Sequence, residues 1–446
     1  MMHYDFIIFF EHRTRELENV CLIKAELERR GYSVWLSNTA FWRSIKTFYC
    51  LKADYVIVPY LYDDKFVHYF ADFKEGPPKA IINLQMEQVH TIHTAENGLK
   101  FPKGLAKRFY HLCWGERIVE RLHKEAGIPS HLLLKTGAIG TDFDRVAFRE
   151  GDMDKRQLAE KYSLNSAAPW ILFISPFSLV SLPESELKWN SDFLKIPHYK
   201  YKSYVENLKI IRKATLEWFD NFLTENPSIL LIYRPHPAEM SSDDLIEMVK
   251  RHPNFCVIDD GSIRTWILAC DVLHSCFSTA IVNAYFAGKN CGILRPVPLM
   301  PENELELLRD ADFITDYEKF VAFSKNPAAF EFPVAAETIK EYYEFNEIPV
   351  YKKICDALQQ IHEEGVEIDI PLSDIEPYNL RRNKMLNRML ARLAIFLANF
   401  IHFDCRAKGK NMLWLSRLSK ETFGIQKEVL NMEARMQYLL ERLANN

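Results

Sequence analysis

The chain has 446 residues, of which 48% are hydrophobic, and this length allows two domains with sizeable cores. No apolar run reaches the about 18 residues that a membrane-spanning helix needs. The nine cysteines are scattered singly and form no CxxC pair. We therefore expect a soluble cytoplasmic protein with reduced thiols, and we expect neither a disulfide framework nor a zinc site.

The formal net charge of −4 is distributed unevenly along the chain. From Pro377 to the end there are 13 Lys and Arg against 5 Asp and Glu, so the rest of the chain is clearly acidic. An acidic body argues against a nucleic-acid groove across the fold. The basic tail is expected to meet something anionic, such as a membrane face.

Short β-branched and aromatic runs alternate with helical patterns from the N-terminus onward. A helix is expected over Arg15–Arg30, with apolar residues at helical spacing and Gly31 as its stop. The strands expected in the first half are Tyr4–Phe10, Ser33–Leu36, Asp54–Pro59, Ala80–Leu84, His111–Trp114 and Leu132–Thr136. This alternation predicts βαβ units and a parallel sheet.

The pattern restarts after a polar, charged stretch, Phe148–Pro169, which is interpreted as the region between two domains. The strands expected in the second half are Trp170–Ser175, Ile229–Tyr233, Phe255–Ile258, Val272–Ser275 and Cys291–Leu294. The predicted fold class is therefore α/β, with two Rossmann-like domains that face each other across a cleft. Ligands of such sheets bind beyond the carboxyl ends of the strands, so the residues just after each strand are the ones to examine.

The expected domain boundaries follow from these patterns. The prediction is an N-terminal acceptor domain over residues 1–150, a C-terminal nucleotide domain over 165–335, return helices over 336–376 and a helical extension over 377–446.

The most specific local motif is Ile229–Pro237, ILLIYRPHP. A hydrophobic strand runs into Arg234 and His236, each of which precedes a proline that favours extended geometry. The guanidinium of Arg234 offers a planar fork for phosphate oxygens, and the His236 imidazole can donate to one. The alternative is a strand end with incidental polar residues.

The next motif is Asp271–Lys289, DVLHSCFSTAIVNAYFAGK. A strand ends at Ser275, and Ser278 and Thr279 then open a helix that stops at Gly288. Two hydroxyls beside free backbone N–H groups suit a diphosphate or a nucleoside monophosphate. The alternative is an ordinary N-cap, the more common use of Ser and Thr.

These two motifs resemble the donor half of GT-B transferases that build bacterial capsules, lipopolysaccharide and teichoic acids. The segments EHRTRELENVCLIKAELERRGYSVWL and CWGERIVERLHKEAGIPSHLLLKTGAIGTDFDR also resemble the first domain of surface-carbohydrate proteins, so the resemblance covers residues 1–340. It implies that Arg234, His236, Ser278 and Thr279 hold the phosphate of a cytidine nucleotide. Asn283 stands where that group usually has a Glu that contacts the donor ribose or sugar.

In that group the first domain normally supplies an acidic base. Glu87, just past a predicted strand, is the residue expected to take the acceptor proton, with His90 as the second choice and a solvated loop glutamate as the structural alternative. Weaker interpretations concern the residues after other strands. They assign acceptor contacts to Glu11, His12 and Arg13, donor contacts to Ser175 and Ser178, and a nucleoside contact or a simple turn to Asp259–Ser262, with Ser262 at its end.

The tail segment Arg381–Phe403 places basic residues before an apolar run of about eleven, which suits a helix lying in a membrane interface. The alternative is a helix packed on the body or on a dimer partner. Residues Met412–Leu443 favour a helical hairpin or self-association.

The predicted function is transfer of a sugar from a nucleotide-activated donor, CMP-linked and Kdo-like, to a surface-polysaccharide or lipid-linked acceptor. His236 and Glu87 would be its catalytic residues. A CMP leaving group carries less charge than a diphosphate, so neither a metal nor another cofactor is expected. A CDP-polyol phosphotransferase and a non-catalytic assembly protein with a degenerate donor site are the alternatives.

Overall fold

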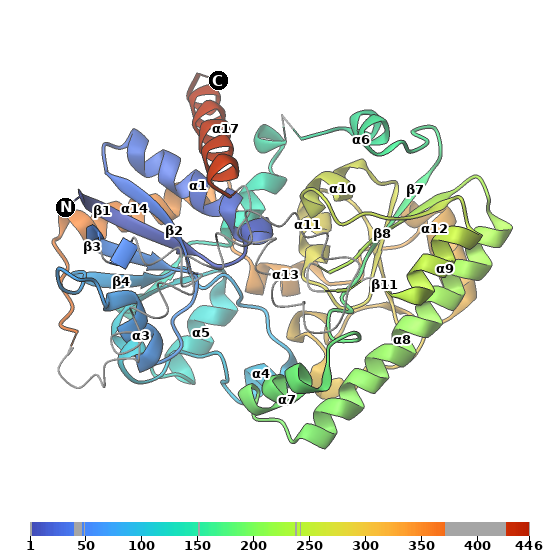
Figure 1. Ribbon diagram of the computed structural model, residues 1–446, viewed down its shortest axis with the longest axis horizontal. Helices are drawn as coiled ribbons and strands as arrows, with labels where there is room; N and C mark the ends of the chain where they lie inside the picture. Colours follow the sequence, from blue (N-terminus) through green and yellow to red (C-terminus); the bar gives the residue numbers. More distant parts are fainter. Residues whose placement is uncertain are drawn as a thin grey trace, which may run out of the picture. The chain divides into compact units, whose positions relative to one another are not determined.

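The structure is a computed structural model that describes residues 2–39, 47–48, 50–149, 152–236, 239–240, 242–370 and 425–445. These residues form two compact units. Unit 1 contains Met1–Gln88, Lys100–Asp142 and Tyr343–Asn446, and unit 2 contains Val89–Leu99 and Phe143–Tyr342, as far as these ranges are described. Each unit is built on one parallel sheet of six strands, drawn in blue tones for unit 1 and in green to yellow for unit 2 (Figure 1).

The sheet of unit 1 has the strand order β2-β1-β3-β4-β5-β6. Its strands are β1 Met2–Phe10, β2 Val34–Asn38, β3 Leu51–Val58, β4 Ala80–Asn83, β5 Tyr110–Cys113 and β6 Leu133–Lys135. The predicted helix appears as α1, Arg13–Arg29, and its apolar positions Leu17, Val20, Cys21 and Leu27 are all buried. Every strand predicted for this half is present within a few residues of its expected bounds.

The sheet of unit 2 has the order β12-β11-β10-β7-β8-β9. Its strands are β7 Trp170–Ile174, β8 Leu230–Arg234, β9 Phe255–Val257, β10 Val272–Ser275, β11 Cys291–Leu294 and β12 Phe313–Ile314. The first five were predicted. The sixth was missed because a strand of two residues carries no alternation pattern.

The remaining helices of the two units complete the βαβ pattern. They are α3 Asp64–Ala71, α4 Ile92–Glu96, α5 Glu116–Lys124, α6 Lys155–Tyr162, α7 Glu184–Phe193, α8 His198–Glu225, α9 Asp243–Arg251, α10 Ile263–Ala269, α11 Ala280–Phe286, α12 Tyr317–Lys325, α13 Ala336–Tyr342, α14 Val350–Glu363 and α17 Ile425–Asn445. The 3₁₀ turns are Gly104–Arg108, Ser130–Leu132, Ile139–Asp144, Val146–Phe148, Pro301–Asn303, Glu306–Leu308 and Pro327–Ala329.

The polar stretch interpreted as an inter-domain region contains helix α6. Asp154 and Gln157 form a capping box at its start, and Leu158 and Ala159 are buried on its inner face. The Lys155 ammonium donates to Asp271 at 2.6 Å, which ties the helix to the start of β10. The stretch was interpreted as an inter-domain region because polar residues cover the outer face of α6. The structure shows that it contains a helix of unit 2.

The return of the chain to unit 1 is fixed by Asp142. Its two carboxylate oxygens accept from the backbone N–H groups of Val350 and Tyr351 at 2.8 and 2.7 Å, so Asp142 caps the first turn of α14. A side chain at Gly137 would come within 2.7 Å of the Glu344 carbonyl, which explains a glycine at this close approach. Gly137 and Asp142, which lie in the segment that resembles the surface-carbohydrate proteins, thus have a structural role within unit 1.

The last helix, α17, packs along α1 of unit 1 (Figure 1). Met436, Leu439 and Leu440 are buried, and Arg435 donates to Glu18 at 3.0 Å. The predicted interfacial segment Arg381–Phe403 lies outside the described residues. In the described ranges, 2–370 with its short gaps and 425–445, no helix has both the length and the hydrophobicity to cross a bilayer. The cysteines of these ranges are free thiols.

Candidate functional site

The carboxyl ends of four neighbouring strands in unit 2, β10, β7, β8 and β9, lie along one edge of the sheet because all four are parallel. The residues predicted to bind the donor follow these ends. Ser175 and Ser178 come after β7, His236 after β8, Ser262 after β9, and Ser278 and Thr279 after β10. The topology therefore brings the predicted donor residues to one edge, as expected for a ligand-binding edge of an α/β sheet.

A buried carboxylate, Glu239, holds the loop that follows β8. Its two oxygens accept from the Tyr233 hydroxyl at 2.8 Å, from the Ser175 hydroxyl at 2.5 Å and from the His236 backbone N–H at 3.2 Å. The Arg212 Nε lies 3.6 Å from the same carboxylate, and the Glu239 side chain is only 2% exposed. Glu239 thus fixes the backbone at His236, and it commits the Ser175 hydroxyl to the protein rather than to a donor.

Arg234 also differs from its prediction. Its guanidinium donates to the carbonyls of Ile258 and Asp260 at 2.9 and 2.5 Å and to that of Gly261 at 2.8 Å. Both terminal nitrogens are therefore occupied by the loop that follows β9, and the residue is only 7% exposed. The fork that was predicted to be presented to phosphate instead shapes the neighbouring loop.

Other predicted donor residues remain at the surface of this edge. His236, Ser178 and Ser262 are half-buried and Thr279 is exposed. Ser278 accepts from the Ala280 backbone N–H at 3.2 Å, so it caps the start of α11, which is the structural alternative for this motif. The geometry leaves these side chains at the edge of unit 2, where a ligand can reach them.

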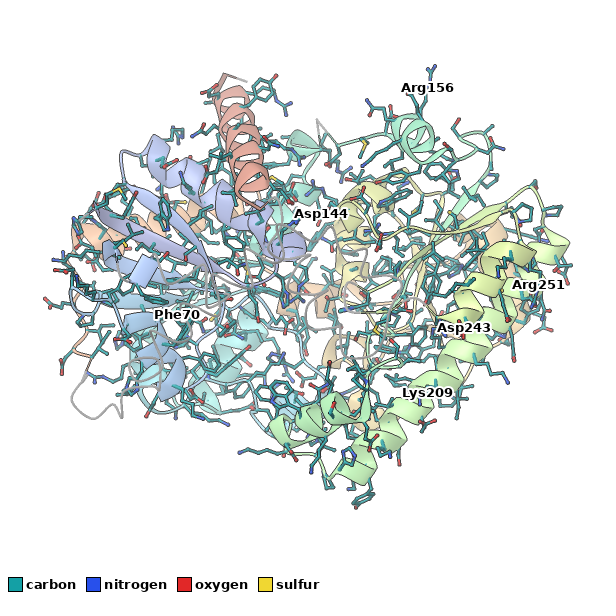
Figure 2. The ribbon with its side chains drawn as sticks, in the orientation of Figure 1. Phe70, Asp144, Arg156, Lys209, Asp243 and Arg251 are labelled. Atoms are coloured by element: carbon teal, nitrogen blue, oxygen red, sulfur yellow. The ribbon has the colours of Figure 1, made fainter. Side chains whose placement is uncertain are left out.

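Asn283 is engaged by a carboxyl group. Its amide donates to Asp144 Oδ2 at 2.9 Å, while Asp144 Oδ1 is buried without a hydrogen-bond partner (Asp144 is labelled in Figure 2). Burial raises the pKa of Asp144 to about 7, against the lowering effect of Asn283 and of Arg264 and Arg149 nearby. Asn283 stands where the resembling group has a Glu, and its amide is hydrogen-bonded to the carboxyl group of Asp144.

In unit 1 the carboxyl end of β1 carries a cluster of three titratable groups, Glu11, His12 and Glu16. Their ligand atoms all lie within 4.8 Å of one another. Glu16 is 3% exposed and accepts from the Glu11 backbone N–H at 2.7 Å, whereas the His12 side chain is 45% exposed. Burial raises the pKa of Glu16 to about 7, although the Glu11 N–H and the Arg15 charge oppose the shift. The sequence pointed to Glu11 and His12 here but missed Glu16, because one glutamate in a helical pattern gives no sign of its burial.

Glu87, the predicted base, follows β4 and is bound by two cations. Arg15 donates to one of its oxygens at 2.8 Å and Lys100 to the other at 2.6 Å. Although burial opposes ionisation, Lys100 and Arg15 hold the pKa of Glu87 far below its usual range. Such a carboxylate is ionised at neutral pH but has little affinity for a proton, so it is a weak general base.

Arg13 and His90, the two remaining residues predicted to contact the acceptor, lie in different units. Arg13 begins α1 and forms an ion pair of 2.6 Å with Glu428 of α17. His90 is 7% exposed and belongs to the short excursion Val89–Leu99 of unit 2, where its carbonyl accepts from Glu306. The structure therefore does not bring His90 into the same unit as Glu87.

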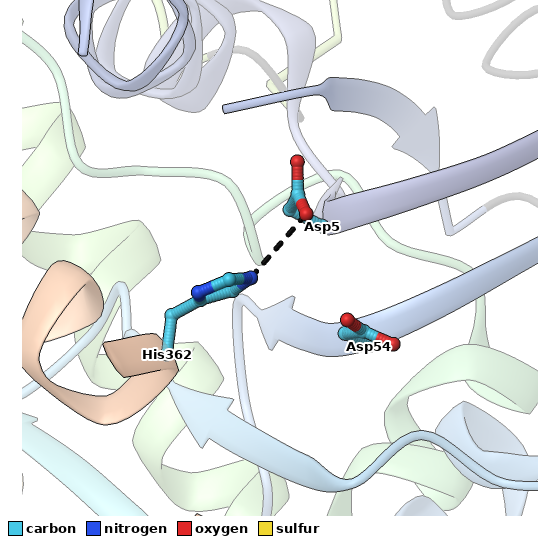
Figure 3. Close-up of side chains that lie close together, drawn as sticks. All are labelled: Asp5, Asp54 and His362. Atoms are coloured by element: carbon cyan, nitrogen blue, oxygen red, sulfur yellow. Dashed lines mark hydrogen bonds and ion pairs between the residues drawn. The ribbon is translucent and has the colours of Figure 1, made fainter. Parts of the chain in front are cut away.

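Asp5, Asp54 and His362 form the second group of unit 1 whose atoms could hold a metal ion (Figure 3). Asp5 accepts from both the N–H and the hydroxyl of Ser33 at 2.7 Å and pairs with His362 at 3.3 Å. Asp54 pairs with His3 at 3.0 Å. These pairs connect α14 to β1 and connect β3 to β1 near the amino-terminal ends of the two strands, at the end of the sheet opposite to Glu11.

No family model matches the sequence, and no curated protein matches it either. Solved structures do. The wall teichoic acid polymerase TagF superposes with a TM-score of 0.51 at 11% identity, over 82% of this chain and 90% of that one. The UDP-GlcNAc 2-epimerase of Neisseria meningitidis, bound to UDP-GlcNAc, gives a TM-score of 0.48 at 12% identity, over 80% of this chain and 100% of that one. The likeness to TagF, with the two parallel sheets, establishes the predicted GT-B fold class.

Proposed function

We propose that the protein transfers a sugar from a nucleotide-activated donor, CMP-linked and Kdo-like, to a surface-polysaccharide or lipid-linked acceptor. The observation that carries the proposal is the carboxyl edge of unit 2, where His236 follows β8, and Ser278 and Thr279 follow β10, the two parallel strands on either side of β7. The fold supports the substrate class, since the chain is similar to a protein named as a wall teichoic acid polymerase.

In this proposal the edge of unit 2 binds the donor. His236, Ser278 and Thr279 contact the phosphate, because an imidazole and two hydroxyls can each donate to a phosphate oxygen. Arg234 acts as a positioning residue, since it holds the loop of Asp260 and Gly261 that precedes Ser262. That loop, with Ser262 and Asn283, would contact the nucleoside.

The cluster at the end of β1 in unit 1 takes the acceptor proton in this proposal. The acceptor oxygen forms a bond to the anomeric carbon, the bond from that carbon to the phosphate oxygen breaks, and the nucleotide leaves as CMP. The His12 side chain is 45% exposed, and its ring lies within 4.8 Å of the carboxyls of Glu11 and Glu16, whose negative charge would stabilise the imidazole after it has taken the acceptor proton. We therefore prefer His12, supported by Glu16, to Glu87 as the base.

A second candidate is the transfer of a polyol phosphate from a CDP-polyol, which the likeness to a teichoic acid polymerase favours. Both reactions release CMP, but they break different bonds. Sugar transfer leaves all phosphorus on the nucleotide, whereas polyol-phosphate transfer places a phosphodiester on the acceptor. A ³¹P spectrum of the purified product therefore distinguishes the two.

The test of the donor site is a thermal-shift series with CMP, CDP, UMP, UDP and GDP. A ligand at 100 times its Kd adds about 2.7 kcal/mol to the free energy of unfolding, and this raises the melting temperature by several degrees. We expect the cytidine nucleotides to give the largest shift. A preference for UDP would contradict the cytidine donor, and the absence of any shift would favour a non-catalytic assembly protein.

A further inference from the structure

Helix α7 and the first turns of α8 form a separate small cluster at one end of unit 2 (Figure 1). Its core consists of Leu187, Tyr201 and Val205. The rest of α8, from Leu208 onward, packs into the main core of the unit. The two helices are therefore a hairpin held to the sheet through the second half of α8.

The outer face of this hairpin is aromatic and exposed. Leu187 and Ser191 are buried on the inner face of α7, and Trp189 and Phe193 point from the opposite face because they are offset by two residues. Their rings stack at 5.5 Å with an angle of 6° between planes. Trp189 is 64% exposed, Phe193 52%, and Tyr199 at the start of α8 68%. Three large aromatic side chains within eleven residues are more than isolated surface hydrophobics.

Three lysines lie in the same stretch of the chain as these rings. Lys188, Lys195 and Lys200 are exposed and form no ion pair or side-chain hydrogen bond within the described part of the chain. Lys195 also has a φ of 54°, a left-handed turn conformation that Gly or Asn adopts more easily.

From Glu184 to Lys202 there are four lysines against three acidic residues, so the hairpin keeps a small positive excess. Glu184 already pairs with His198 at 2.9 Å and with Lys202 at 3.1 Å, while Asp192 is exposed beside Phe193. The hairpin therefore combines two stacked, exposed aromatic rings with three exposed lysines that form no ion pair among the described residues.

We propose that this aromatic–lysine surface docks the protein on anionic phospholipid. Trp and Tyr side chains favour the headgroup level of a bilayer, where the rings meet acyl chains and their polar atoms meet water. The lysines supply the charge complementary to anionic headgroups. This inference goes beyond the proposed transfer reaction and does not depend on it. It differs from the sequence prediction, which assigned membrane contact to the basic tail alone.

The test is flotation of the full-length protein with phosphatidylcholine vesicles that contain about one-third phosphatidylglycerol. We expect Trp189→Ser combined with Phe193→Ser to reduce vesicle binding at least tenfold. Each of Lys188→Ala, Lys195→Ala and Lys200→Ala is expected to reduce it about fivefold, on anionic vesicles only. The matched control is Ile246→Ser with Val249→Ser, two exposed apolar residues of α9 in the same unit, and it should bind like the wild type.

A local readout keeps the proposal testable if the tail also binds vesicles. The emission of Trp189 is obtained as the difference between wild type and Trp189→Phe, and anionic vesicles should shift it to shorter wavelength. An unshifted Trp189 signal would overturn the proposal. It would also be overturned if the aromatic double variant changed a dimer into a monomer while its vesicle binding stayed at the wild-type level, because the surface would then be a contact between copies. Nucleotide-induced thermal shifts should be the same in all these variants, which separates this test from that of the transfer reaction.

Discussion

In both units a parallel sheet of six strands carries polar loops at its carboxyl edge, but the two edges use their charges differently. In unit 2 the charged side chains of Arg234 and Glu239 are buried and hold loops, and the proposed phosphate contacts are the Ser278 and Thr279 hydroxyls and the His236 imidazole. In unit 1 the carboxylates Glu11 and Glu87 remain half-exposed at the edge, beside the buried Glu16.

This difference fits two separate roles, anion binding for the edge of unit 2 and proton transfer for the edge of unit 1. An edge of fixed loops with hydroxyl and imidazole groups offers several hydrogen-bond donors to an anion. An edge with a carboxyl whose pKa is about 7 is suited to exchange a proton near neutral pH. The following predictions test these two roles, beginning with the largest expected effect.

The largest effect is expected at His12. His12→Ala should lower kcat by about 10²–10⁴, the usual contribution of a general base, and should leave CMP affinity nearly unchanged. Turnover on a defined acceptor and calorimetry with CMP measure the two quantities. Glu87→Ala is the matched comparison, and it should keep more than about a tenth of wild-type turnover because its carboxylate is neutralised by Arg15 and Lys100. The reverse order of these two losses would return the base to Glu87.

Glu16 provides a pH test of the same cluster. The pKa of Glu16 is raised to about 7 by burial, so turnover should fall as the pH drops through about 7 and Glu16 takes up its proton. Glu16→Gln removes the group that titrates there, so the acid limb near pH 7 should disappear. An unchanged pH profile of kcat in Glu16→Gln would mean that the cluster does not govern proton transfer.

In unit 2 the expected effect of comparable size is on stability. Glu239→Ala removes the acceptor of Ser175, Tyr233 and the His236 N–H, and each buried donor left without a partner costs about 1–3 kcal/mol. Urea unfolding should therefore show a lower free energy of unfolding. The control Glu217→Ala changes a glutamate of α8 that is 62% exposed, and it should stay within about 0.5 kcal/mol.

These residues also show what the sequence could and could not predict. Eleven of the twelve strands were predicted from short apolar, β-branched or aromatic runs, and the edge of unit 2 followed from them. The partners of charged side chains could not be predicted, since Arg234 and Glu87 look the same in sequence whether they face a ligand or an ion pair. Glu239 was missed because it lies after the strand, the prolines and the histidine that drew attention, and only its burial shows its role.

A smaller effect is expected at His236. If it contacts the donor phosphate, His236→Ala should weaken CMP binding about tenfold, the size expected for one hydrogen bond to a charged group. Because phosphate is bound both before and during transfer, kcat should fall as well. His131→Ala, an exposed histidine in unit 1, is the control for calorimetry. Equal CMP affinity in wild type and His236→Ala would remove the phosphate contact from the proposal.

The smallest effect concerns the brace of the unit 1 edge by α17. Arg13 stands one residue after His12 and pairs with Glu428 at 2.6 Å, with side chains that are 31% and 36% exposed. Ion pairs of this exposure contribute about 0–1 kcal/mol, so Arg13→Ala should lower the free energy of unfolding by no more than that.

Arg13 was predicted from sequence to contact the acceptor, and the two roles differ in their readout. A structural brace predicts that Arg13→Ala and Glu428→Ala lower stability equally and leave the KM for acceptor unchanged, because either substitution breaks the same pair. An acceptor contact predicts a higher KM in Arg13→Ala alone. We expect the first result, since the guanidinium of Arg13 is already held by a carboxylate of α17, and an increase in acceptor KM confined to Arg13→Ala would show that the pair opens when acceptor binds.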